Sequence, residues 1–468
     1  MNDQLIKSSK EINMKWADDL TIKGKFLVGT VPLLIFASFT MRITGQKEAM
    51  RPNMIIIVAD DLGWKDVGYH GSEIKTPTLD KMAIEGAVFD RFYVHSVCSP
   101  TRASLLTGRF PGRFGIFSPL GDEPGLPAGT TTLAELLRQN GYETAISGKW
   151  HLGATPEARP RNYGFDVSYG YLRGQIDPYT HLYKNGDTTW HRNDLFVKET
   201  GHATDLITTE ALRFIAKPRE KNRPFFLLVT YSVPHYPLEE PDHWSNVYKG
   251  IIKNKSRREY AASVTHMDNE VNKILTALEK NHLDKNTMIL FFSDNGGQKS
   301  WYPKDEYNNK FDSHAVLGNN LPLRAWKTWA YDGALRVPAL LYWPEVIKHR
   351  NISEHLNVAD VFPTFARLAG ASLDDNTKID GIDFWPALEG KRLSEDRIMY
   401  WRMANFIALK KGDWKLIRFL DKNETVREEL YNITLDPYEE KNVAAEESSI
   451  VDKLQKHVEE QLSMDQTL

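Results

Sequence analysis

Two pairs of adjacent polar residues follow apolar runs in this sequence, and they could hold a metal ion. Asp60 and Asp61 come after the run 54–58, and Asp294 and Asn295 end the run that starts at Thr287. Ligand sites of open α/β sheets lie beyond the carboxyl ends of the strands. Adjacent carboxylates stay ionised at low cost when a cation neutralises them. An all-oxygen set suits Ca²⁺ or Mg²⁺, although a helix cap or a turn is the common alternative role for any one aspartate.

Cys98 is the only cysteine in 468 residues, so it cannot form an internal disulfide. The segment 99–109, SPTRASLLTGR, predicts a turn leading into a helix. A helix N-terminus lowers the pKa of a thiol and favours anions. Arg102 follows one helical turn later and can lie over the same site. Composition alone favours the alternative of a buried structural cysteine, since free cysteines are among the most buried residues.

Further cationic and imidazole side chains occur near predicted strand ends or in Gly/Pro-rich loops. Lys149 and His151 lie two residues apart in SGKWHLG, where a strand end would point both side chains the same way. His235 lies between prolines in SVPHYPL, and Lys327 lies in the loop 321–338. Each residue alone is more often solvated than catalytic. Together with Arg102, and around a cation, they would form a pocket for a sulfate or phosphate group.

The elements that must position these residues are predicted to alternate between strands and helices. The apolar runs at 53–64, 223–235 and 287–297 are typical of parallel strands buried on both faces. Helical patterns occur at 76–89, 130–142 and 266–283, and an amphipathic helix is predicted over 355–370. This alternation predicts an α/β sheet with helices on both faces.

The C-terminal part differs in character from the rest. After about residue 395, two short strands flank a turn at 411–413, a third strand follows, and a helix starts near Glu446. We therefore predict a catalytic domain over 51–392. Residues 393–468 are predicted to form a smaller α+β subdomain, an antiparallel sheet with a terminal helix.

The N-terminal segment 1–50 is predicted to be a targeting segment. The apolar run 26–41 follows Lys23 and Lys25 and is short for a membrane span, which needs about 20 residues. Its length suits a secretory signal peptide, with a single-pass anchor or a buried helix as alternatives. We expect an exported protein, periplasmic, secreted or lysosome-like according to its host, without stable membrane association after cleavage. A net charge of −3 gives no electrostatic reason to expect nucleic-acid binding.

The segment CSPTR (98–102) followed by LTGR (106–109) resembles the signature of type I sulfatases in the alkaline phosphatase superfamily. GKWHLG (148–153) is similar to the second signature of that family, and the similarity extends from about residue 52 to 445. The resemblance implies an alkaline phosphatase-like fold, with a large, mixed and mostly parallel sheet sandwiched by helices.

The resemblance also implies roles for the residues singled out above. Cys98 would be oxidised to formylglycine (3-oxoalanine) by a formylglycine-generating enzyme, and its hydrated aldehyde would be the nucleophile. Arg102 and Lys149 would hold the nucleophile, and His151 would take the proton that triggers sulfate release. The implied ligands of one Ca²⁺ or Mg²⁺ per subunit are Asp60, Asp61, Asp294, Asn295 and the modified Cys98.

The substrate implied is a sulfated carbohydrate. Residues 169–181 and the loop around Lys327 look most similar to N-acetylgalactosamine-4-sulfatases, which suggests a sulfate ester on galactose or N-acetylgalactosamine, at the 4-position by analogy. Lys149, His235, Lys327 and His181 would bind the substrate, with His235 or Lys327 as general acid. In place of the glycines usual before this lysine, the chain has Ala325 and Trp326. The alternatives are a formylglycine-dependent phosphonate or phosphate ester hydrolase and a catalytically silent carbohydrate-binding relative.

Overall fold

The computed structural model describes residues 51–466 except 122–124, 221–222, 374–376, 395 and 421–425. These residues belong to one compact unit, Ala49–Leu468. The predicted targeting segment lies outside the described residues. In the part of the chain that is described, no helix is both long and apolar enough to cross a membrane.

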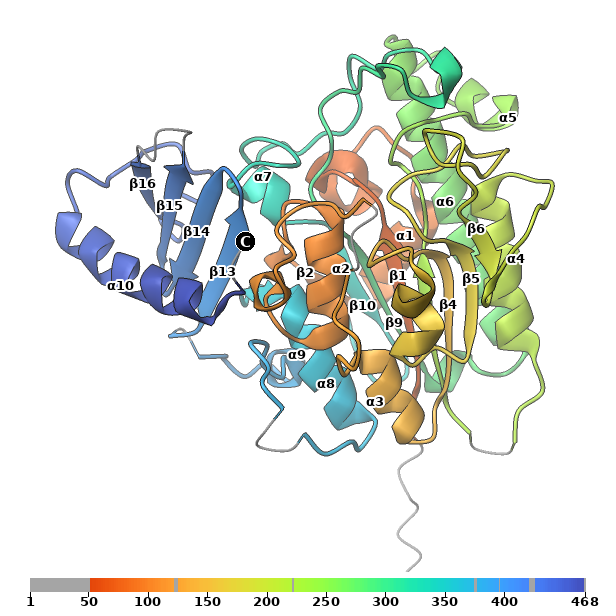
Figure 1. Cartoon of the computed structure of the whole chain (residues 1–468), viewed down its shortest axis with the longest axis horizontal. Coiled ribbons are helices and arrows are strands. Elements are labelled where there is room, and N and C mark those ends of the chain that lie inside the picture. Colours follow the sequence, from red (N-terminus) through yellow and green to blue (C-terminus); the bar gives the residue numbers. More distant parts are fainter. Residues whose placement is uncertain are drawn as a thin grey trace, which may run out of the picture. The chain divides into compact units, whose positions relative to one another are not determined.

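The centre of the unit is a ten-stranded sheet in the order β11-β2-β10-β9-β1-β8-β4-β5-β6-β7 (Figure 1). Its middle is parallel and consists of β9 (Thr287–Ser293), β1 (Asn53–Ala59), β8 (Phe225–Thr230), β4 (Glu143–Lys149) and β5 (Val167–Tyr171). The flanking strands are β10 (Ala339–Tyr342), β2 (Ala87–Phe89), β11 (Arg350–Ile352), β6 (Trp190–Arg192) and β7 (Leu195–Phe196). Because β10, β6 and β7 each pair antiparallel with a neighbour, the sheet is mixed and mostly parallel, as predicted.

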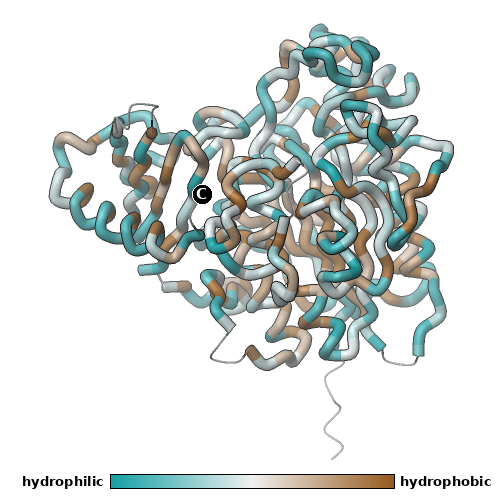
Figure 2. The backbone as a smooth tube through the Cα atoms, in the orientation of Figure 1, coloured by the Kyte–Doolittle hydropathy of each residue, from teal (hydrophilic) through white to brown (hydrophobic). Residues whose placement is uncertain are grey.

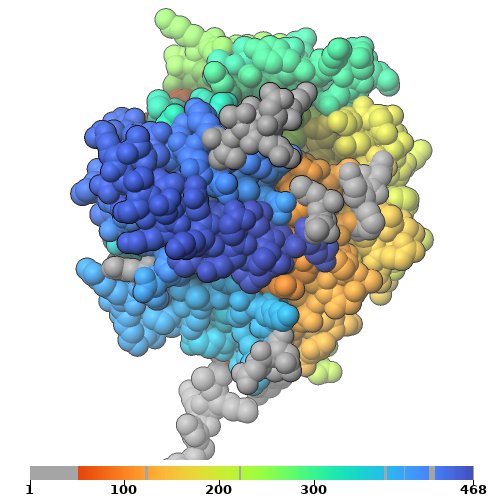
Figure 3. Space-filling view, turned by 60° about the vertical axis from the view of Figure 1, so that its left-hand side comes forward, coloured from red at the N-terminus to blue at the C-terminus, as the bar shows by residue number. Residues whose placement is uncertain are grey.

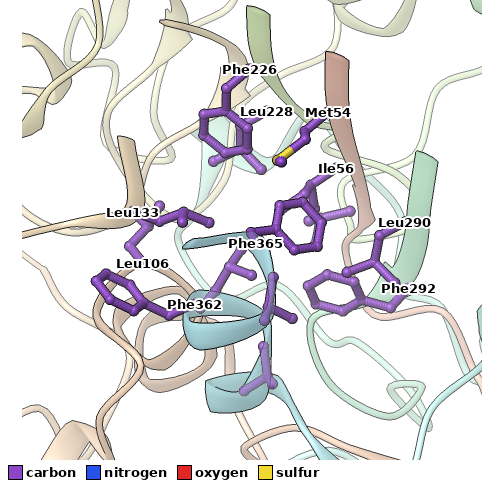
Figure 4. Close-up of a cluster of buried hydrophobic side chains, with 14 of the residues drawn as sticks. Met54, Ile56, Leu106, Leu133, Phe226, Leu228, Leu290, Phe292, Phe362 and Phe365 are labelled. Atoms are coloured by element: carbon purple, nitrogen blue, oxygen red, sulfur yellow. The ribbon is translucent and has the colours of Figure 1, made fainter. Parts of the chain in front are cut away.

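Successive residues of β1 face opposite sides of the sheet, and helices cover both sides. Met54 and Ile56 pack with α2 (Cys98–Thr107), α3 (Leu133–Gln139) and α8 (Val361–Leu368). Figure 4 shows this packing, with Phe362 and Phe365 of α8 among the strand residues. The opposite face carries α1 (Pro77–Glu85), α4 (Ala203–Ala216) and α6 (Lys255–Lys280). Each such side chain stabilises the fold by about 1.5–3 kcal/mol when fully buried, and Figure 2 shows hydrophobic segments concentrated in this sheet.

Three predicted helix boundaries are wrong. The helix expected at 76–89 ends at Glu85, because Gly86 is extended and residues 87–89 form strand β2. The helix expected at 266–283 begins at Lys255, where Asn254 caps it by accepting a hydrogen bond from the backbone N–H of Arg257. The helix expected over 355–370 begins only at Val361, because residues 356–357 form the short strand β12 against β3 (Phe92–Tyr93). The strand pairing satisfies backbone groups that the helical pattern had assigned to the first turn.

The C-terminal part is a four-stranded antiparallel sheet covered by one helix, as predicted. Its strands are β13 (Ile398–Met403), β14 (Phe406–Lys411), β15 (Trp414–Leu420) and β16 (Val426–Asn432). Gly412 has φ +56° in the predicted turn between β14 and β15, a conformation that glycine adopts without steric cost. The apolar face of α10 (Ser448–Met464) packs on this sheet.

The end of α10 lies against the segment that follows α2 (Figure 3). Arg113 Nη1 donates to Asp465 Oδ1 over 2.8 Å, and Gln466 N donates to the Gly112 carbonyl over 2.9 Å. The remaining helices are short, namely α5 (Asp242–Asn246), α7 (Asp332–Leu335) and α9 (Trp385–Leu388). The domain boundaries at 50 and 392 stay predictions.

Candidate active site

The carboxyl ends of four neighbouring parallel strands bring the predicted site residues together. Asp60 directly follows β1, Asp294 directly follows β9, and Lys149 is the last residue of β4. His235 lies in the loop after β8. Parallel strands end at the same edge of a sheet, so residues as far as 234 positions apart meet there, as Asp61 and Asn295 do.

Two lysines pair with the two adjacent aspartates. Lys149 Nζ donates to Asp60 Oδ2 over 2.6 Å. Lys327 Nζ donates to both oxygens of Asp61, over 2.6 and 2.9 Å. Asn295 Nδ2 also donates to Asp61 Oδ1, over 2.7 Å. The structure therefore places Lys327, whose surroundings depart most from the family pattern, in the same cluster as the acidic pair.

The electrostatic environment gives Asp60 and Asp61 very different pKa values. Burial, followed by the Asp294 carboxylate, raises the pKa of Asp60 to about 7, although Lys149 opposes this. Burial also opposes ionisation of Asp61, but Lys327 and His235 outweigh it and lower the pKa of Asp61 to about 2. Asp60 is thus the member of the pair whose ionised form a bound cation would stabilise.

The donor atoms in this cluster fit a hard divalent cation. Asp60 Oδ1 and Asn295 Oδ1 are buried and have no hydrogen-bond partner among the described residues. Asp60, Asp61 and His235 each offer a ligand atom within 4.8 Å of the others. Carboxylate and amide oxygens are the ligands that Ca²⁺ and Mg²⁺ prefer. The residues that would hold the ion are Asp60, Asp61, Asp294 and Asn295.

Cys98 is the first residue of α2 and is 2% exposed, so the predicted helix begins without the turn expected after this residue. Its Sγ lies 3.2 Å from His151 Nδ1. Burial raises the pKa of the Cys98 thiol, although Lys149 and Lys327 oppose this shift. A thiol in this state is a poor nucleophile, because the thiolate is the reactive form.

Arg102 lies one turn further along α2 and points into the cluster. Its Nη2 donates to Asp294 Oδ2 over 2.7 Å, and its Nη1 donates to the Lys149 carbonyl over 2.9 Å. The guanidinium therefore connects α2 to the ends of β9 and β4. This pairing with Asp294 is a charge-assisted bond with both partners almost fully buried.

His151 is oriented as a neutral proton acceptor toward position 98. Its Nε2 lies 2.8 Å from the Leu120 carbonyl, which can only accept, so Nε2 carries the proton and Nδ1 presents its lone pair to Cys98. Burial, then the charges of Lys149 and Arg102, hold the pKa of His151 well below its usual range.

The strand-alternation argument for His151 does not hold. The residue lies beyond the end of β4 with φ +57°, so an irregular backbone, rather than strand geometry, aims its ring. Sequence analysis also missed the residue that supports it. Ser99 Oγ donates to the His151 carbonyl over 2.9 Å and accepts from Leu120 N over 3.0 Å. The position of Ser99 beside Cys98 was the only signal.

His235 faces the cluster through its second ring nitrogen. Its Nδ1 donates to the Tyr236 carbonyl, and its Nε2 lies 3.7 Å from Asp61 Oδ2. Burial, followed by the charge of Lys327, holds the pKa of His235 well below its usual range, although Asp61 opposes this shift. A neutral His235 with its proton on Nδ1 presents a lone pair at Nε2, so it can act as an acid only after Nε2 has taken up a proton.

His181 is placed apart from these contacts. It is 3% exposed, its ring stacks on Trp190 at 4.5 Å, and its Nε2 donates to the Gly201 carbonyl over 3.0 Å. Its substrate-binding role stays a prediction. Trp190 and Trp301 are 1% and 6% exposed, so these two tryptophans belong to the core and have no free ring face to offer a sugar.

The fold and this cluster define an α/β enzyme whose buried cations and acidic oxygens suit an anionic ester group. The chain belongs to the sulfatase family: the family model described as Sulfatase matches residues 52–371. A second model, N-sulphoglucosamine sulphohydrolase, C-terminal, matches residues 325–467. The protein is thus a sulfuric ester hydrolase, as predicted.

Individual relatives support this assignment. Mouse arylsulfatase J is 30% identical over 474 residues, which cover 88% of this chain and 75% of that protein. Dog N-acetylgalactosamine-6-sulfatase is 33% identical over 388 residues, covering 78% and 71%. The crystal structure of Ps i-CgsB in complex with k-i-k-neocarrahexaose is 34% identical with a TM-score of 0.80, and the match covers 89% of this chain and 94% of that one. A specific closeness to 4-sulfatases stays a prediction.

Proposed function

We propose that this sulfatase hydrolyses a sulfate ester on a galactose or N-acetylgalactosamine unit of a sulfated polysaccharide, at the 4-position by analogy. The observation that carries the proposal is the convergence of nine polar residues on Cys98 at one sheet edge. Relatives named for N-acetylgalactosamine 6-sulfate, and a similar structure bound to a neocarrahexaose, support a galactose-type substrate.

The proposed nucleophile is the residue that replaces Cys98 after oxidation by a formylglycine-generating enzyme. The hydrated aldehyde supplies one hydroxyl for in-line attack on sulfur and a second through which the aldehyde reforms. A bound Ca²⁺ or Mg²⁺ would lower the pKa of that hydroxyl and offset charge on the sulfate oxygens. The high pKa and burial of the unmodified thiol support this proposal, because Cys98 itself is poorly suited to attack.

The proton acceptor in the proposal is His151. Its Nδ1 faces position 98 at 3.2 Å, and its Nε2–H is held by the Leu120 carbonyl. A neutral imidazole in this orientation can take a proton from the side chain at position 98 as sulfate is released. Ser99 keeps the ring in place through the backbone of residues 120 and 151.

The substrate sulfate would be held by the cationic side chains of the cluster. Lys327 and Lys149 both have their ammonium groups on buried aspartates, within reach of the space beside position 98. His235 Nε2 shares that space and is the candidate acid for the leaving alcohol. Arg102 positions the nucleophile from one turn below it.

The proposal includes export from the cytoplasm, on the basis of the N-terminal apolar run and the single cysteine. The partners proposed are the sulfated carbohydrate and, during maturation, the formylglycine-generating enzyme.

Activity and mass test this function together. Full-length protein co-produced with a formylglycine-generating enzyme should hydrolyse an aryl sulfate, and the Cys98→Ala variant should lose that activity by at least about 10³-fold. The peptide containing residue 98 should weigh about 18 Da less than its cysteine form, as conversion of a thiol to an aldehyde requires.

Two results would contradict the proposal. Faster cleavage of phosphate or phosphonate esters than of sulfate esters would favour the alternative hydrolase. An unmodified cysteine mass in fully active enzyme would exclude the formylglycine. The position of the hydrolysed sulfate is then decided with defined substrates, namely the 4- and 6-sulfates of galactose and N-acetylgalactosamine. The measurement is the release of inorganic sulfate from each.

A further inference from the structure

A buried carboxylate outside the cation cluster lies just after the loop that carries Asp60 and Asp61. Asp66 is 0% exposed and ends a short 3₁₀ turn, Trp64–Asp66. Its Oδ1 accepts from Arg257 Nη2 over 2.6 Å, so its charge is paired. A buried charge persists where it is both paired and hydrogen-bonded, and its partners then fix its geometry. The remaining partners of Asp66 show what this geometry holds in place.

The second oxygen of Asp66 binds the backbone of two separate segments. Oδ2 accepts from Gly63 N over 3.1 Å and from Asn319 N over 2.8 Å. A Cβ atom at Gly63 would lie only 2.4 Å from the same oxygen, so the carboxylate packs directly on the loop after β1. Asp66 therefore joins the loop of the acidic pair to the segment around residue 319.

A hydroxyl of α6 supports the backbone of Asp61. Tyr260 Oη lies 3.0 Å from the Asp61 carbonyl oxygen and 2.8 Å from Asp66 Oδ2, and it accepts from Gly63 N over 3.2 Å. Asp61 has φ +69°, a left-handed conformation that is uncommon for residues other than glycine and persists where the surroundings fix it. Tyr260 and Asp66 thus contribute to the backbone conformation that aims the Asp61 carboxylate.

Arg257 of α6 balances the charge of Asp66 and binds the same neighbouring segment. While its Nη2 pairs with Asp66, its Nη1 donates to the Leu317 carbonyl over 2.7 Å. Its Nε donates to Glu73 Oε1 over 2.9 Å. The pair of Asp66 and Arg257 therefore holds the loop after β1 and the segment 317–319 against each other.

Asn320 extends this arrangement to the remaining members of the cluster. Its Oδ1 accepts from Gly297 N over 2.9 Å, and its Nδ2 donates to the Ala325 carbonyl over 3.1 Å. Gly297 lies two residues after Asn295, and Ala325 lies two residues before Lys327. The same segment thus connects the two loops that supply the rest of the cluster.

We propose that Asp66 and Tyr260 are positioning residues for the divalent cation, acting through the backbone of Asp61 without touching the ion. This inference rests on the proposed function, which includes the cation. Groups that orient the ligands of a metal site typically change its affinity by about 10–100-fold when they are lost. Asp66 bonds to the loop of the acidic pair, to the segment 317–319 and to α6, so its loss should displace the ligand oxygens.

Calcium binding to the metal-free, full-length protein tests the proposal. Asp66→Asn and Tyr260→Phe should each weaken Ca²⁺ binding by at least about tenfold in isothermal titration calorimetry. The amide of Asp66→Asn must turn its NH₂ group either toward Arg257 or toward the backbone N–H donors, which are donors themselves. Tyr260→Phe removes only the hydroxyl and keeps the ring, so it decides the test if Asp66→Asn does not fold.

Two matched controls separate positioning from a general loss of stability. Asp360 is equally buried, binds both Nη atoms of Arg397 at 2.7 Å and accepts from Asn357 N over 2.7 Å and from Ile382 N over 2.9 Å. Tyr248 is as buried as Tyr260, and its hydroxyl accepts from Lys75 N over 2.8 Å. Asp360→Asn and Tyr248→Phe should lower the melting temperature comparably but keep the Ca²⁺ affinity within about twofold of the parent.

Three results would overturn the proposal. The first is an unchanged Ca²⁺ affinity in the two variants, and the second is an equal loss of affinity in the variants and their controls. The third is a parent protein that binds neither Ca²⁺ nor Mg²⁺.

A separate measurement distinguishes this inference from the proposed function. With formylglycine present, Asp66→Asn should need at least about tenfold more Ca²⁺ than the parent for half-maximal hydrolysis of an aryl sulfate. Absence of hydrolysis in the parent, with the expected order of Ca²⁺ affinities, would refute the function and leave the inference standing. An active parent with equal affinities in all variants would refute the inference alone.

Discussion

At the scale of single residues, the donor atoms of the site fit a divalent cation. Asp60, Asp61 and Asp294 are fully or almost fully buried, and one oxygen of Asp60 has no partner within the described part of the chain. Lys149, Lys327 and Arg102 each pair with one of these carboxylates, yet burial and then Asp294 raise the pKa of Asp60 to about 7, so a bound cation would stabilise its ionised form.

We therefore expect Ca²⁺ or Mg²⁺ to stabilise the chelator-treated protein. At a concentration 100 times the dissociation constant the gain is about 2.7 kcal/mol, because the ion binds only the folded state. Thermal unfolding with and without the ion measures it. Asp60→Asn should abolish most of the rise in melting temperature, and KCl at equal ionic strength should not reproduce it. If the ion raised the melting temperature of Asp60→Asn as much as that of the parent, the ion would bind at another site.

At the scale of elements, a histidine holds two helices and a loop together. His266 on α6 contacts Glu240 through Nδ1 at 2.7 Å and Asp205 on α4 through Nε2 at 3.5 Å. His202, Glu240 and His266 are close enough to hold a metal. His202 Nδ1 accepts from Thr204 N over 3.3 Å, which leaves the proton on Nε2, and Nε2 lies 3.7 Å from Glu240 Oε1.

The charge on His266 predicts a pH dependence of stability. Burial opposes that charge, but Asp205 and Glu240 outweigh it and raise the pKa of His266 to about 9. A raised pKa contributes stability that is complete below the unfolded value of about 6.5 and is lost as pH rises through about 9. The melting temperature of the parent should therefore fall more between pH 6 and 9.5 than that of His266→Gln. Parallel curves for the two proteins would contradict this assignment.

At the scale of the whole molecule, a buried ion cluster connects the C-terminal sheet to α7 and to the two-stranded sheet of β3 and β12. Lys415 on β15 is fully buried and donates to Asp332 Oδ1 over 2.8 Å and to Glu439 Oε1 over 2.6 Å. Tyr93 of β3 donates to the other oxygen of Asp332 over 2.9 Å. Burial raises the pKa of Glu439 to about 7, although Lys415 opposes this.

Removal of this lysine should loosen the two parts of the unit. Lys415→Met leaves two buried carboxyl groups without their cation, a loss of about 3–5 kcal/mol. In a unit of this size that lowers the melting temperature by roughly 4–5 °C. Differential scanning calorimetry measures it, and Lys411→Met, four residues earlier, should change little. A shift of less than 1 °C in Lys415→Met would show that the cluster contributes nothing to stability.

The sequence by itself determined the strands, their parallel class and most of the site. Uninterrupted apolar runs can be buried only on both faces, so 54–58, 223–230 and 287–293 had to be central strands. Because parallel strands share a carboxyl edge, Asp60, Lys149 and Asp294 had to meet there. The motif around Cys98 and Arg102 predicted the helix that begins at residue 98.

Only the tertiary structure decided how the side chains are aimed and which ones pair. The ring of His151 points at position 98 because of a left-handed backbone and the Leu120 carbonyl, which no local pattern encodes. Lys327 reaches Asp61 across 266 positions of sequence. The buried Trp190 and the pair of Asp66 with Arg257 likewise arise from packing between distant segments. Local sequence sets backbone periodicity, whereas burial, pairing and pKa depend on neighbours that only folding brings together.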